Sequence, residues 1–235
     1  MRTIGLIGGM SWESTAVYYR LINTLVRERL GGLHSADILL RSVDFSGIVA
    51  LQKAGDWDGA GAVLGDVAEG LARAGADSVL ICTNTMHLVA EAVAARPGVR
   101  LIHVIDETAA TVRDGGCRRP LLLATAYTME HGFYADRMAA RGITTLVPEA
   151  ADRAAVHGII FEELCQGVIR DESRAALTRI IARGRAAGAD SVILGCTEIC
   201  LLLDPDALAL PGFDSTAIHA RAAVDDALRG GGLVD

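Results

Sequence analysis

Two stretches of this chain decide its fold: Ala74-Gly75-Ala76-Asp77-Ser78-Val79-Leu80-Ile81-Cys82-Thr83 and the later Ala187-Gly188-Ala189-Asp190-Ser191-Val192-Ile193-Leu194-Gly195-Cys196-Thr197. Six consecutive residues are identical at an offset of 113, and the inserted Gly195 places the two cysteines 114 residues apart. In each copy a glycine turn leads into an apolar strand that ends in Cys-Thr. A common helix–turn–strand connector that arose twice would explain the six residues but not the continuation into Cys-Thr. The repeat therefore predicts two related halves.

Outward from these stretches, short apolar runs alternate with longer amphipathic segments. Strands are predicted at residues 4–7, 37–43, 78–81, 101–104, 121–123 and 191–194. Helices are predicted at residues 14–30, 58–74, 85–95, 129–141, 154–170, 174–187 and 216–228. Strands that alternate with helices indicate parallel βαβ units, so the chain is predicted to have an α/β fold.

A second internal similarity pairs Ile4–Glu13 with Leu121–Glu130 at an offset of 117, about half of the 235 residues, and sets Ser11 opposite Thr128. We therefore predict two pseudosymmetric α/β lobes with parallel-sheet cores. The first lobe comprises residues 1–97 plus 210–235 and carries Cys82, and the second comprises 98–209 and carries Cys196. We expect the active site in the cleft between the lobes.

Composition excludes several classes of protein. The chain has 22 basic and 29 acidic residues and a net charge of −7, so no nucleic-acid partner is expected. Hydrophobic residues make up 51% of the chain, which is typical of a globular protein with a core. No apolar run approaches the ~18 residues of a membrane span, and no signal peptide is recognised at the N-terminus. The odd count of five cysteines favours free thiols in a reducing, cytoplasmic compartment.

The same composition limits the chemistry. Lys53 is the only lysine, so pyridoxal phosphate would have one candidate attachment site, and Lys53 reads as a solvated residue at a helix end. The run Gly5-x-x-Gly8-Gly9 does not match the dinucleotide-binding pattern. The Cys and His spacings do not match zinc sites. We therefore expect no cofactor and no metal.

Polar clusters follow four of the predicted strands, two in each half. In parallel α/β sheets, ligands bind beyond the carboxyl ends of the strands. The expected substrate is therefore a small molecule held by these clusters, with one cysteine from each half. The four clusters are Gly8-Gly9-Met10-Ser11, Cys82-Thr83-Asn84-Thr85, Thr125-Ala126-Tyr127-Thr128 and Cys196-Thr197-Glu198.

Two cysteines at matching positions suit two-base catalysis. Backbone N–H groups at a helix start are expected to lower the pKa of each thiol. A thiolate and a thiol on opposite faces of a tetrahedral carbon can invert it, because one removes the proton and the other returns one. The neighbouring Thr and Asn side chains and N–H groups suit an α-carboxylate.

Each of these residues also has a plainer interpretation. A lone cysteine after a strand is more often a small buried hydrophobe, and only the match between Cys82 and Cys196 favours catalysis. Cys165 and Cys200 are expected in the core, and Cys117 in a loop. Glu198 either orients the Cys196 thiol and binds an ammonium group, or is a solvated glutamate at a helix start.

The quoted motifs resemble the aspartate/glutamate racemase family, and in particular its subgroup of bacterial broad-specificity amino-acid racemases and aspartate racemases. The similarity spans nearly the whole chain and is carried by 8–15, 42–45, 82–87, 128–130, 159–164 and 195–199. It implies cofactor-independent racemisation of a free amino acid with Cys82 and Cys196 as the bases. It also implies a homodimer, from the family's habit. The substrate-binding residues are then expected to be Met10, Ser11, Gln52, Thr83, Asn84, Thr85, Thr128, Thr197 and Glu198.

Departures from the family's pattern concern specificity. Aspartate-specific relatives place a cationic residue near the neutral Gln52, and close relatives carry a basic residue at Ala126. Glutamate racemases have histidine where this chain has Glu198. A preference broader than aspartate or glutamate is therefore expected. The alternatives are a hydantoin racemase, a maleate-type isomerase, a malonate decarboxylase, a cysteine hydrolase and a non-catalytic amino-acid sensor.

Overall fold

A computed structural model describes residues 1–229 of the chain, which divide into two compact units. Unit 1 comprises Met1–Val104 and the chain from His219 onward, and unit 2 comprises Ile105–Ile218. The predicted boundaries at 97 and 210 differ from this division. Residues 98–104 belong to unit 1 because Leu101 bridges to Val79, and 210–218 belong to unit 2 because they contain a strand of its sheet. Residues 230–235, which the first lobe was predicted to include, lie outside the described residues.

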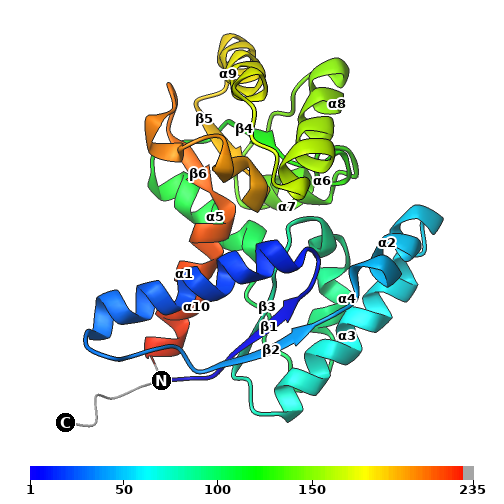
Figure 1. The fold of residues 1–235 in the computed structure, drawn as a ribbon, viewed down its shortest axis with the longest axis vertical. Helices are drawn as coiled ribbons and strands as arrows, with labels where there is room; N and C mark the ends of the chain where they lie inside the picture. Colours follow the sequence, from blue (N-terminus) through cyan, green and yellow to red (C-terminus); the bar gives the residue numbers. More distant parts are fainter. Residues whose placement is uncertain (230–235) are drawn as a thin grey trace. The chain divides into compact units, whose positions relative to one another are not determined.

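Unit 1 is built on a three-stranded parallel sheet with the order β2-β1-β3 (Figure 1). Successive residues of β1 face opposite sides: Ile4 and Leu6 pack with α1 and α10, whereas Ile7 packs with α2, α3 and α4. Because both faces are covered, every residue of β1 and β3 is buried. The elements of this unit are β1 (Ile4–Gly8), α1 (Trp12–Leu30), β2 (Ile38–Ser42), α2 (Phe45–Ala54), α3 (Trp57–Arg73), β3 (Ser78–Ile81), a 3-10 helix (Thr85–Val89), α4 (Ala90–Ala94) and most of α10 (Ser215–Arg229).

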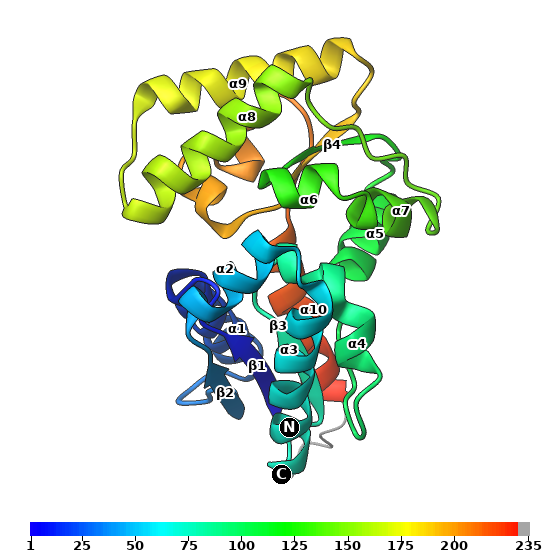
Figure 2. The same ribbon diagram turned by 90° about the vertical axis from the view of Figure 1, so that its right-hand side faces the viewer.

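Unit 2 repeats this plan with a parallel sheet in the order β4-β5-β6, whose helices are seen in Figure 2. Its strands are β4 (Pro120–Leu123), β5 (Ser191–Leu194) and β6 (Gly212–Asp214), and its helices are α5 (Val104–Asp114), α6 (Ala126–Glu130), α7 (Phe133–Ala139), α8 (Ala150–Gly158) and α9 (Asp171–Ala186). A π-helical turn (Ile159–Glu163) and three 3-10 turns (Leu164–Gln166, Thr197–Leu201 and Pro205–Ala207) complete the unit. The α/β fold with two lobes and parallel sheets is therefore confirmed.

Several predicted elements differ from the structure. The predicted helix 129–141 is broken at Gly132, whose φ of 78° is not helical, and the helix 154–170 changes to π geometry and ends at Gly167. The predicted strand 101–104 is reduced to one bridge, because α5 begins at Val104. Helices α2 and α5 and strand β6 were not predicted as separate elements. Short or weakly periodic elements of this kind depend on neighbours that are distant in sequence.

The repeated Ala-Gly-Ala-Asp-Ser-Val stretch forms the same structure in both units. Gly75 and Gly188 have φ of 105° and 93°, a region that favours glycine, and each ends the preceding helix. The following aspartate accepts hydrogen bonds at the start of the neighbouring strand. Asp77 Oδ2 accepts from the Thr3 N–H at 2.7 Å, and Asp190 Oδ2 accepts from the N–H groups of Arg118 and Arg119 at 2.6 and 2.9 Å. Each repeat thus helps to fix the register between two adjacent strands.

Helix caps place different residues opposite one another than the offset of 117 predicts. Ser11 accepts a hydrogen bond from the Ser14 N–H and caps α1, while Thr125 accepts from the Thr128 N–H and caps α6. The counterpart of Ser11 by role is therefore Thr125, three residues before Thr128. In unit 2 the strand begins one residue earlier than the offset requires, and both the strand and the connection to the helix are one residue shorter, which together give this shift.

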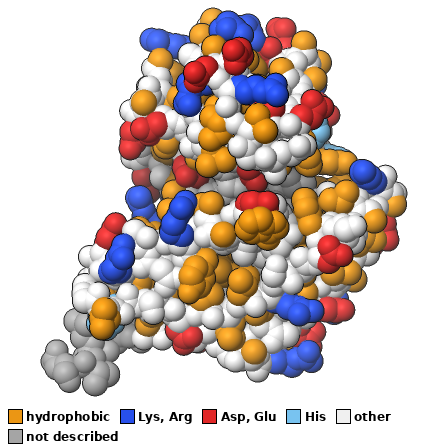
Figure 3. All heavy atoms as spheres, in the orientation of Figure 1, with side chains coloured by type: hydrophobic (Ala, Val, Ile, Leu, Met, Phe, Trp, Pro, Cys, Tyr) orange, Lys and Arg blue, Asp and Glu red, His pale blue; other side chains and the backbone are white. Residues whose placement is uncertain are grey.

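Figure 3 shows basic and acidic side chains interspersed over the face that it displays. Within residues 1–229, no helix is both long enough and apolar enough to cross a membrane.

Asp190→Ala should lower the free energy of unfolding by about 1–3 kcal/mol, because the N–H groups of Arg118 and Arg119, just before β4, lose a charged acceptor. Asp190→Asn keeps one acceptor oxygen and should lose less. Urea unfolding measures both. Asp114→Ala, at an exposed aspartate of unit 2, is the control and should stay within about 0.5 kcal/mol of the parent. Equal stability of Asp190→Ala and the parent would contradict the role of the repeat.

Acid should destabilise the fold through His219. This side chain is fully buried, donates from Nε2 to the Ile102 carbonyl and accepts from Tyr18 Oη at Nδ1. Burial lowers the pKa of His219 to about 4 from its ordinary 6.5. Between these values the unfolded chain binds a proton that the folded chain does not, so the free energy of unfolding should fall by about 3 kcal/mol as the pH drops through this window. His219→Gln should be less stable at neutral pH but show a shallower slope, and His34→Gln, at an exposed histidine, should keep the parent slope.

Candidate active site

The predicted site residues of unit 1 leave the sheet at one edge. Ile7 of β1 is aligned with Ile81 of β3, so the segments that follow both strands start at the same level. The Ser14 hydroxyl at the start of α1 donates to the Cys82 carbonyl at 3.3 Å and links the two segments. The structure thus brings Met10 and Ser11 to the same sheet edge as Cys82, Thr83, Asn84 and Thr85.

The turn after β1 is shaped by a close backbone approach. Gly9 has a φ of 93°, and a Cβ at this position would lie 2.2 Å from the Val43 carbonyl oxygen. Its N–H donates to Thr15 Oγ1 at 2.8 Å, and the following Met10–Ser11 peptide bond is cis. Met10 is buried in the core beneath the turn, whereas Ser11 is half-buried at the cap of α1. Of these two candidates, Ser11 is the better placed to meet a ligand.

Gln52 reaches this edge from α2. Its Nε2 donates to Met86 Sδ at 2.9 Å, and Met86 belongs to the 3-10 helix that begins at Thr85. Gln52 is half-buried and uncharged. It therefore adds a neutral polar side chain beside the Cys82–Thr85 segment.

The Cys82 thiol is buried and protonated. Its side chain is 1% exposed and packs in the apolar cluster between the sheet, α1 and α10. Burial raises the pKa of this thiol. The expectation of a lowered pKa is therefore wrong for Cys82. The helix that follows is a 3-10 helix of five residues, too short to offset the loss of hydration.

In unit 2, Cys196 is joined to a carboxylate. Its thiol donates to Glu198 Oε2 at 2.8 Å, and the same oxygen accepts from Thr197 Oγ1 at 2.7 Å. Burial and the negative charge of Glu198 raise the pKa of Cys196 well above its usual value, so the expected lowering is wrong here too. Gly195 lets the strand pass close to β4, since a Cβ there would lie 2.9 Å from Leu122 Cδ1. The three residues Cys196, Thr197 and Glu198 form one hydrogen-bonded group.

The remaining candidates of unit 2 lie on neighbouring elements. Thr128 is buried in the first turn of α6, with its Oγ1 at 3.2 Å from Thr125 Oγ1. Cys165, in the 3-10 turn after the π-helical segment, lies near enough to Cys196 to add to the rise of that thiol's pKa. Cys117 is buried and Cys200 is half-buried, with its pKa raised mainly by burial.

Sequence reasoning missed the role of His87. The motif at 82–87 contains this residue, but no separate role was predicted for it. In the structure His87 is buried and its Nδ1 lies 2.8 Å from the Thr83 carbonyl oxygen, within the same turn. A residue four positions ahead on a helical segment can return to this carbonyl, so the spacing of Thr83 and His87 was the available signal.

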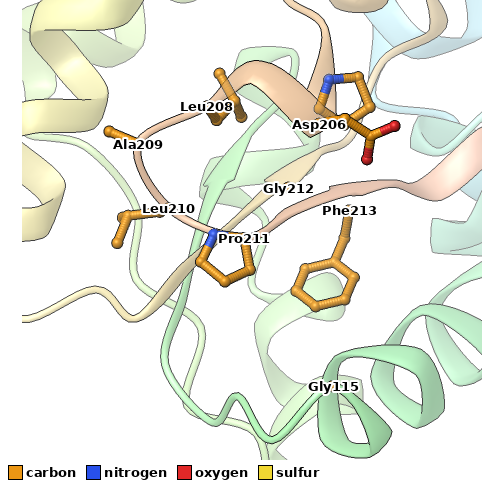
Figure 4. A pocket seen from close by; sticks show the side chains of 9 residues that line it. Gly115, Asp206, Leu208, Ala209, Leu210, Pro211, Gly212 and Phe213 are labelled. Atoms are coloured by element: carbon orange, nitrogen blue, oxygen red, sulfur yellow. The ribbon is translucent and has the colours of Figure 1, made fainter.

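Two surface hollows in unit 2 hold none of the predicted site residues. One, of about 500 Å³, is bordered by Gly115, Pro211, Gly212 and Phe213 and is shown in Figure 4. It lies where β6 begins, at the opposite end of that strand from the expected site. The other, of about 430 Å³, lies between α9 and residues 202–209. In the described part of the chain, no three His, Cys, Asp or Glu side chains gather as a metal site would require.

Comparison with known proteins identifies the family. Residues 7–223 match the model of the Asp/Glu/Hydantoin racemase family. The chain belongs to this family. A crystal structure from Yersinia pestis, of a protein provisionally named an Asp/Glu racemase, is 50% identical with a TM-score of 0.92, over 97% of this chain and 100% of that one. The structure of an aspartate racemase homologue from Pyrococcus horikoshii is 32% identical with a TM-score of 0.87, over 97% and 100%.

A more distant structure supports the fold alone. The aspartate racemase of Picrophilus torridus is 19% identical with a TM-score of 0.72, over 97% of this chain and 94% of that one. Together, the family match and the closer structures make this protein a racemase, and therefore an isomerase.

Glu198→Gln should make Cys196 easier to alkylate at about pH 8.5. The substitution removes the negative charge that raises the thiol pKa, so the iodoacetamide rate at Cys196, followed by peptide mass spectrometry, should rise severalfold. Cys82 should react slowly in both proteins, because burial alone raises its pKa. Glu172→Gln, at an exposed glutamate of α9, should leave the Cys196 rate unchanged. An unchanged rate in Glu198→Gln would contradict the contact between Glu198 and Cys196.

Proposed function

We propose that this racemase inverts free amino acids without an organic cofactor, with Cys82 and Cys196 as the two bases. The observation that carries the proposal is the repeated strand, which ends in Cys-Thr in each unit. Cys82 directly follows the buried strand β3, Cys196 follows the buried strand β5 after Gly195, and each cysteine precedes a 3-10 helix. A structural cysteine would not require this match in surroundings as well as in sequence.

The proposed reaction conserves protons and charge. The thiolate of one cysteine takes the proton from the α-carbon, and the electron pair delocalises into the substrate carboxylate. The other thiol then donates its proton to the opposite face of the carbon, so that one proton has moved from substrate to enzyme and another from enzyme to substrate. The mechanism requires the two thiols to reach opposite faces of one substrate carbon.

Because both thiols are protonated at rest, the mechanism must include a step that converts one of them to a thiolate. For Cys196 we propose that Glu198 accepts the thiol proton, since the two groups are already hydrogen bonded and the transfer leaves the charge of the pair unchanged. Burial alone raises the pKa of Cys82, so its ionisation would depend more on the positive charge of the bound substrate ammonium. The two directions of the reaction would then depend on Glu198 to different extents.

The substrate carboxylate would be held by Thr83, Asn84, Thr85 and Thr197 with the N–H groups beside them, while Ser11, Thr128 and Met10 shape the surroundings. We propose a range of substrates broader than the aspartate of the homologues, because Gln52 and Ala126 offer no positive charge to a second carboxylate. The five free thiols support a location in a reducing cytoplasm.

The alternatives have less support. The family's description includes hydantoin racemases, whose substrates also carry an acidic carbon between polar groups. A cysteine hydrolase would need a histidine oriented as the base for Cys82, but both ring nitrogens of His87 contact backbone groups instead. A one-cysteine decarboxylase would not need the second Cys-Thr. A sensor would bind amino acids without exchanging the α-proton.

Proton exchange in D₂O without added cofactor tests the proposal. Reduced protein is incubated with a panel of L- and D-amino acids, and the Cα–H signal and optical rotation are followed together. The parent should exchange and invert at least one amino acid. Cys82→Ser and Cys196→Ser should each lose inversion by at least about a hundredfold, because a serine hydroxyl is a far weaker acid than a thiol. Glu198→Gln should slow the two directions unequally.

Cys117→Ser is the matched control, since Cys117 follows no strand of either sheet, and it should retain parent rates. Exchange that survives in both cysteine variants would contradict the two-base mechanism. If no amino acid exchanged its α-proton but a hydantoin did, the protein would instead be a hydantoin racemase.

A further inference from the structure

Three histidines that are far apart in sequence form one buried cluster in unit 1. His87, His103 and His219 are each at most 6% exposed. The ring centroids of His87 and His103 are 4.6 Å apart, and those of His87 and His219 are 5.7 Å apart. Only His87 belongs to the segment that follows β3, so it links this cluster to the proposed site.

The contacts of His87 define its tautomer. Nδ1 lies 2.8 Å from the Thr83 carbonyl oxygen, which can only accept, so Nδ1 carries the hydrogen. Nε2 lies 3.4 Å from the backbone nitrogen of Val104, which donates, so Nε2 is the acceptor. The ring is therefore neutral and is held between two backbone groups.

Residue 87 contacts two successive peptide groups, one through its side chain and one through its backbone N–H. Its side chain binds the Thr83 carbonyl, and its own N–H donates to the Asn84 carbonyl at 3.0 Å. In a trans peptide the C=O and the following N–H point in opposite directions. When both carbonyls are turned toward His87, the N–H groups of Asn84 and Thr85 are turned to the other side of the segment. The preceding carbonyl, that of Cys82, is held by the Ser14 hydroxyl.

We infer that His87 is a positioning residue whose side chain, by holding the Thr83 carbonyl, aims the backbone N–H group of Asn84 at the substrate carboxylate. This inference rests on the proposed racemase function, in which that carboxylate gains negative charge as the α-proton leaves. Donors fixed before the reaction stabilise such charge without reorganising. The His87 side chain supplies the fixing contact from the protein interior and does not itself touch the substrate.

His219 provides a matched comparison within the same cluster. It is as buried as His87, but its nitrogens contact Tyr18 and Ile102, which lie outside the segment after β3. Substitution of His219 should therefore affect stability, whereas substitution of His87 should also affect the chemical step.

Substitutions with different reach test the inference. His87→Asn places an amide N–H near the position of Nδ1 and can still donate to the Thr83 carbonyl. His87→Gln places the amide N–H further from the backbone, and His87→Leu has no donor. We expect His87→Leu and His87→Gln to lower kcat for Cα–H exchange by about tenfold or more with KM within about threefold, since a misaimed oxyanion donor chiefly affects the transition state. His87→Asn should recover most of kcat, and His219→Gln should keep the parent kcat per folded molecule.

Near-ultraviolet circular dichroism gives the folded fraction of each variant. If His87→Leu does not fold, the comparison of His87→Asn with His87→Gln carries the test. The inference would be overturned if kcat of His87→Leu or His87→Gln equalled that of the parent. It would also be overturned if kcat of His87→Asn did not exceed that of His87→Gln, or if His219→Gln lost as much kcat as the His87 variants.

A second measurement does not depend on activity. Amide hydrogen exchange should show faster exchange in the peptide covering residues 82–87 of His87→Gln than of His87→Asn, with His219→Gln matching the parent there. If the parent exchanges no amino acid but this pattern is found, the proposed function fails while the contact of His87 stands. If the parent is active but neither kcat nor amide exchange separates Asn from Gln, the inference about His87 fails and the proposed function stands.

Discussion

The aspartate of the repeated turn is the contact on which the rest of the structure depends. In each unit it lies two residues after the glycine that ends a helix, and it accepts hydrogen bonds from N–H groups just before the neighbouring strand. These bonds fix how far two adjacent strands are offset, and because both strands are short, they also fix where the strands end. Cys82 and Cys196 occupy the first positions beyond those ends or one residue later. A contact at the amino ends of the strands in each sheet thus sets the position of the cysteine that follows the carboxyl ends.

Burial, and not the start of a helix, controls the thiols. Each cysteine follows a fully buried strand, so its ionised form would lose much of its hydration, and a five-residue 3-10 helix offers little compensation. In unit 2 the carboxylate of Glu198 adds a further barrier to ionisation but also provides a place for the proton. Protonated resting thiols would resist oxidation and alkylation until a substrate supplies compensating charge.

Much of the fold could be predicted from the sequence, but the contacts of the site could not. The strands at 78–81 and 191–194 were predicted at their observed bounds, because six shared residues and an apolar run leave little ambiguity. The alignment of Ser11 with Thr128 was three residues out, because β4 begins one residue earlier than the offset of 117 requires, is one residue shorter than β1 and is followed by a loop one residue shorter. The contact of His87 with the Val104 N–H could not be predicted, because the two residues are brought together only by the fold.

The sequence by itself determined the α/β class, the twofold repeat and the family, since all three are written in local patterns: alternating apolar runs, a glycine turn and paired Cys-Thr motifs. Only the tertiary structure decided the protonation state of the thiols and the contacts among the histidines. A pKa depends on how much water and charge surround a group, and His87, His103 and His219 meet only because the chain returns to unit 1 through α10. His219 contacts Tyr18 and Ile102, both more than a hundred positions away in the sequence, and no local pattern can specify such contacts.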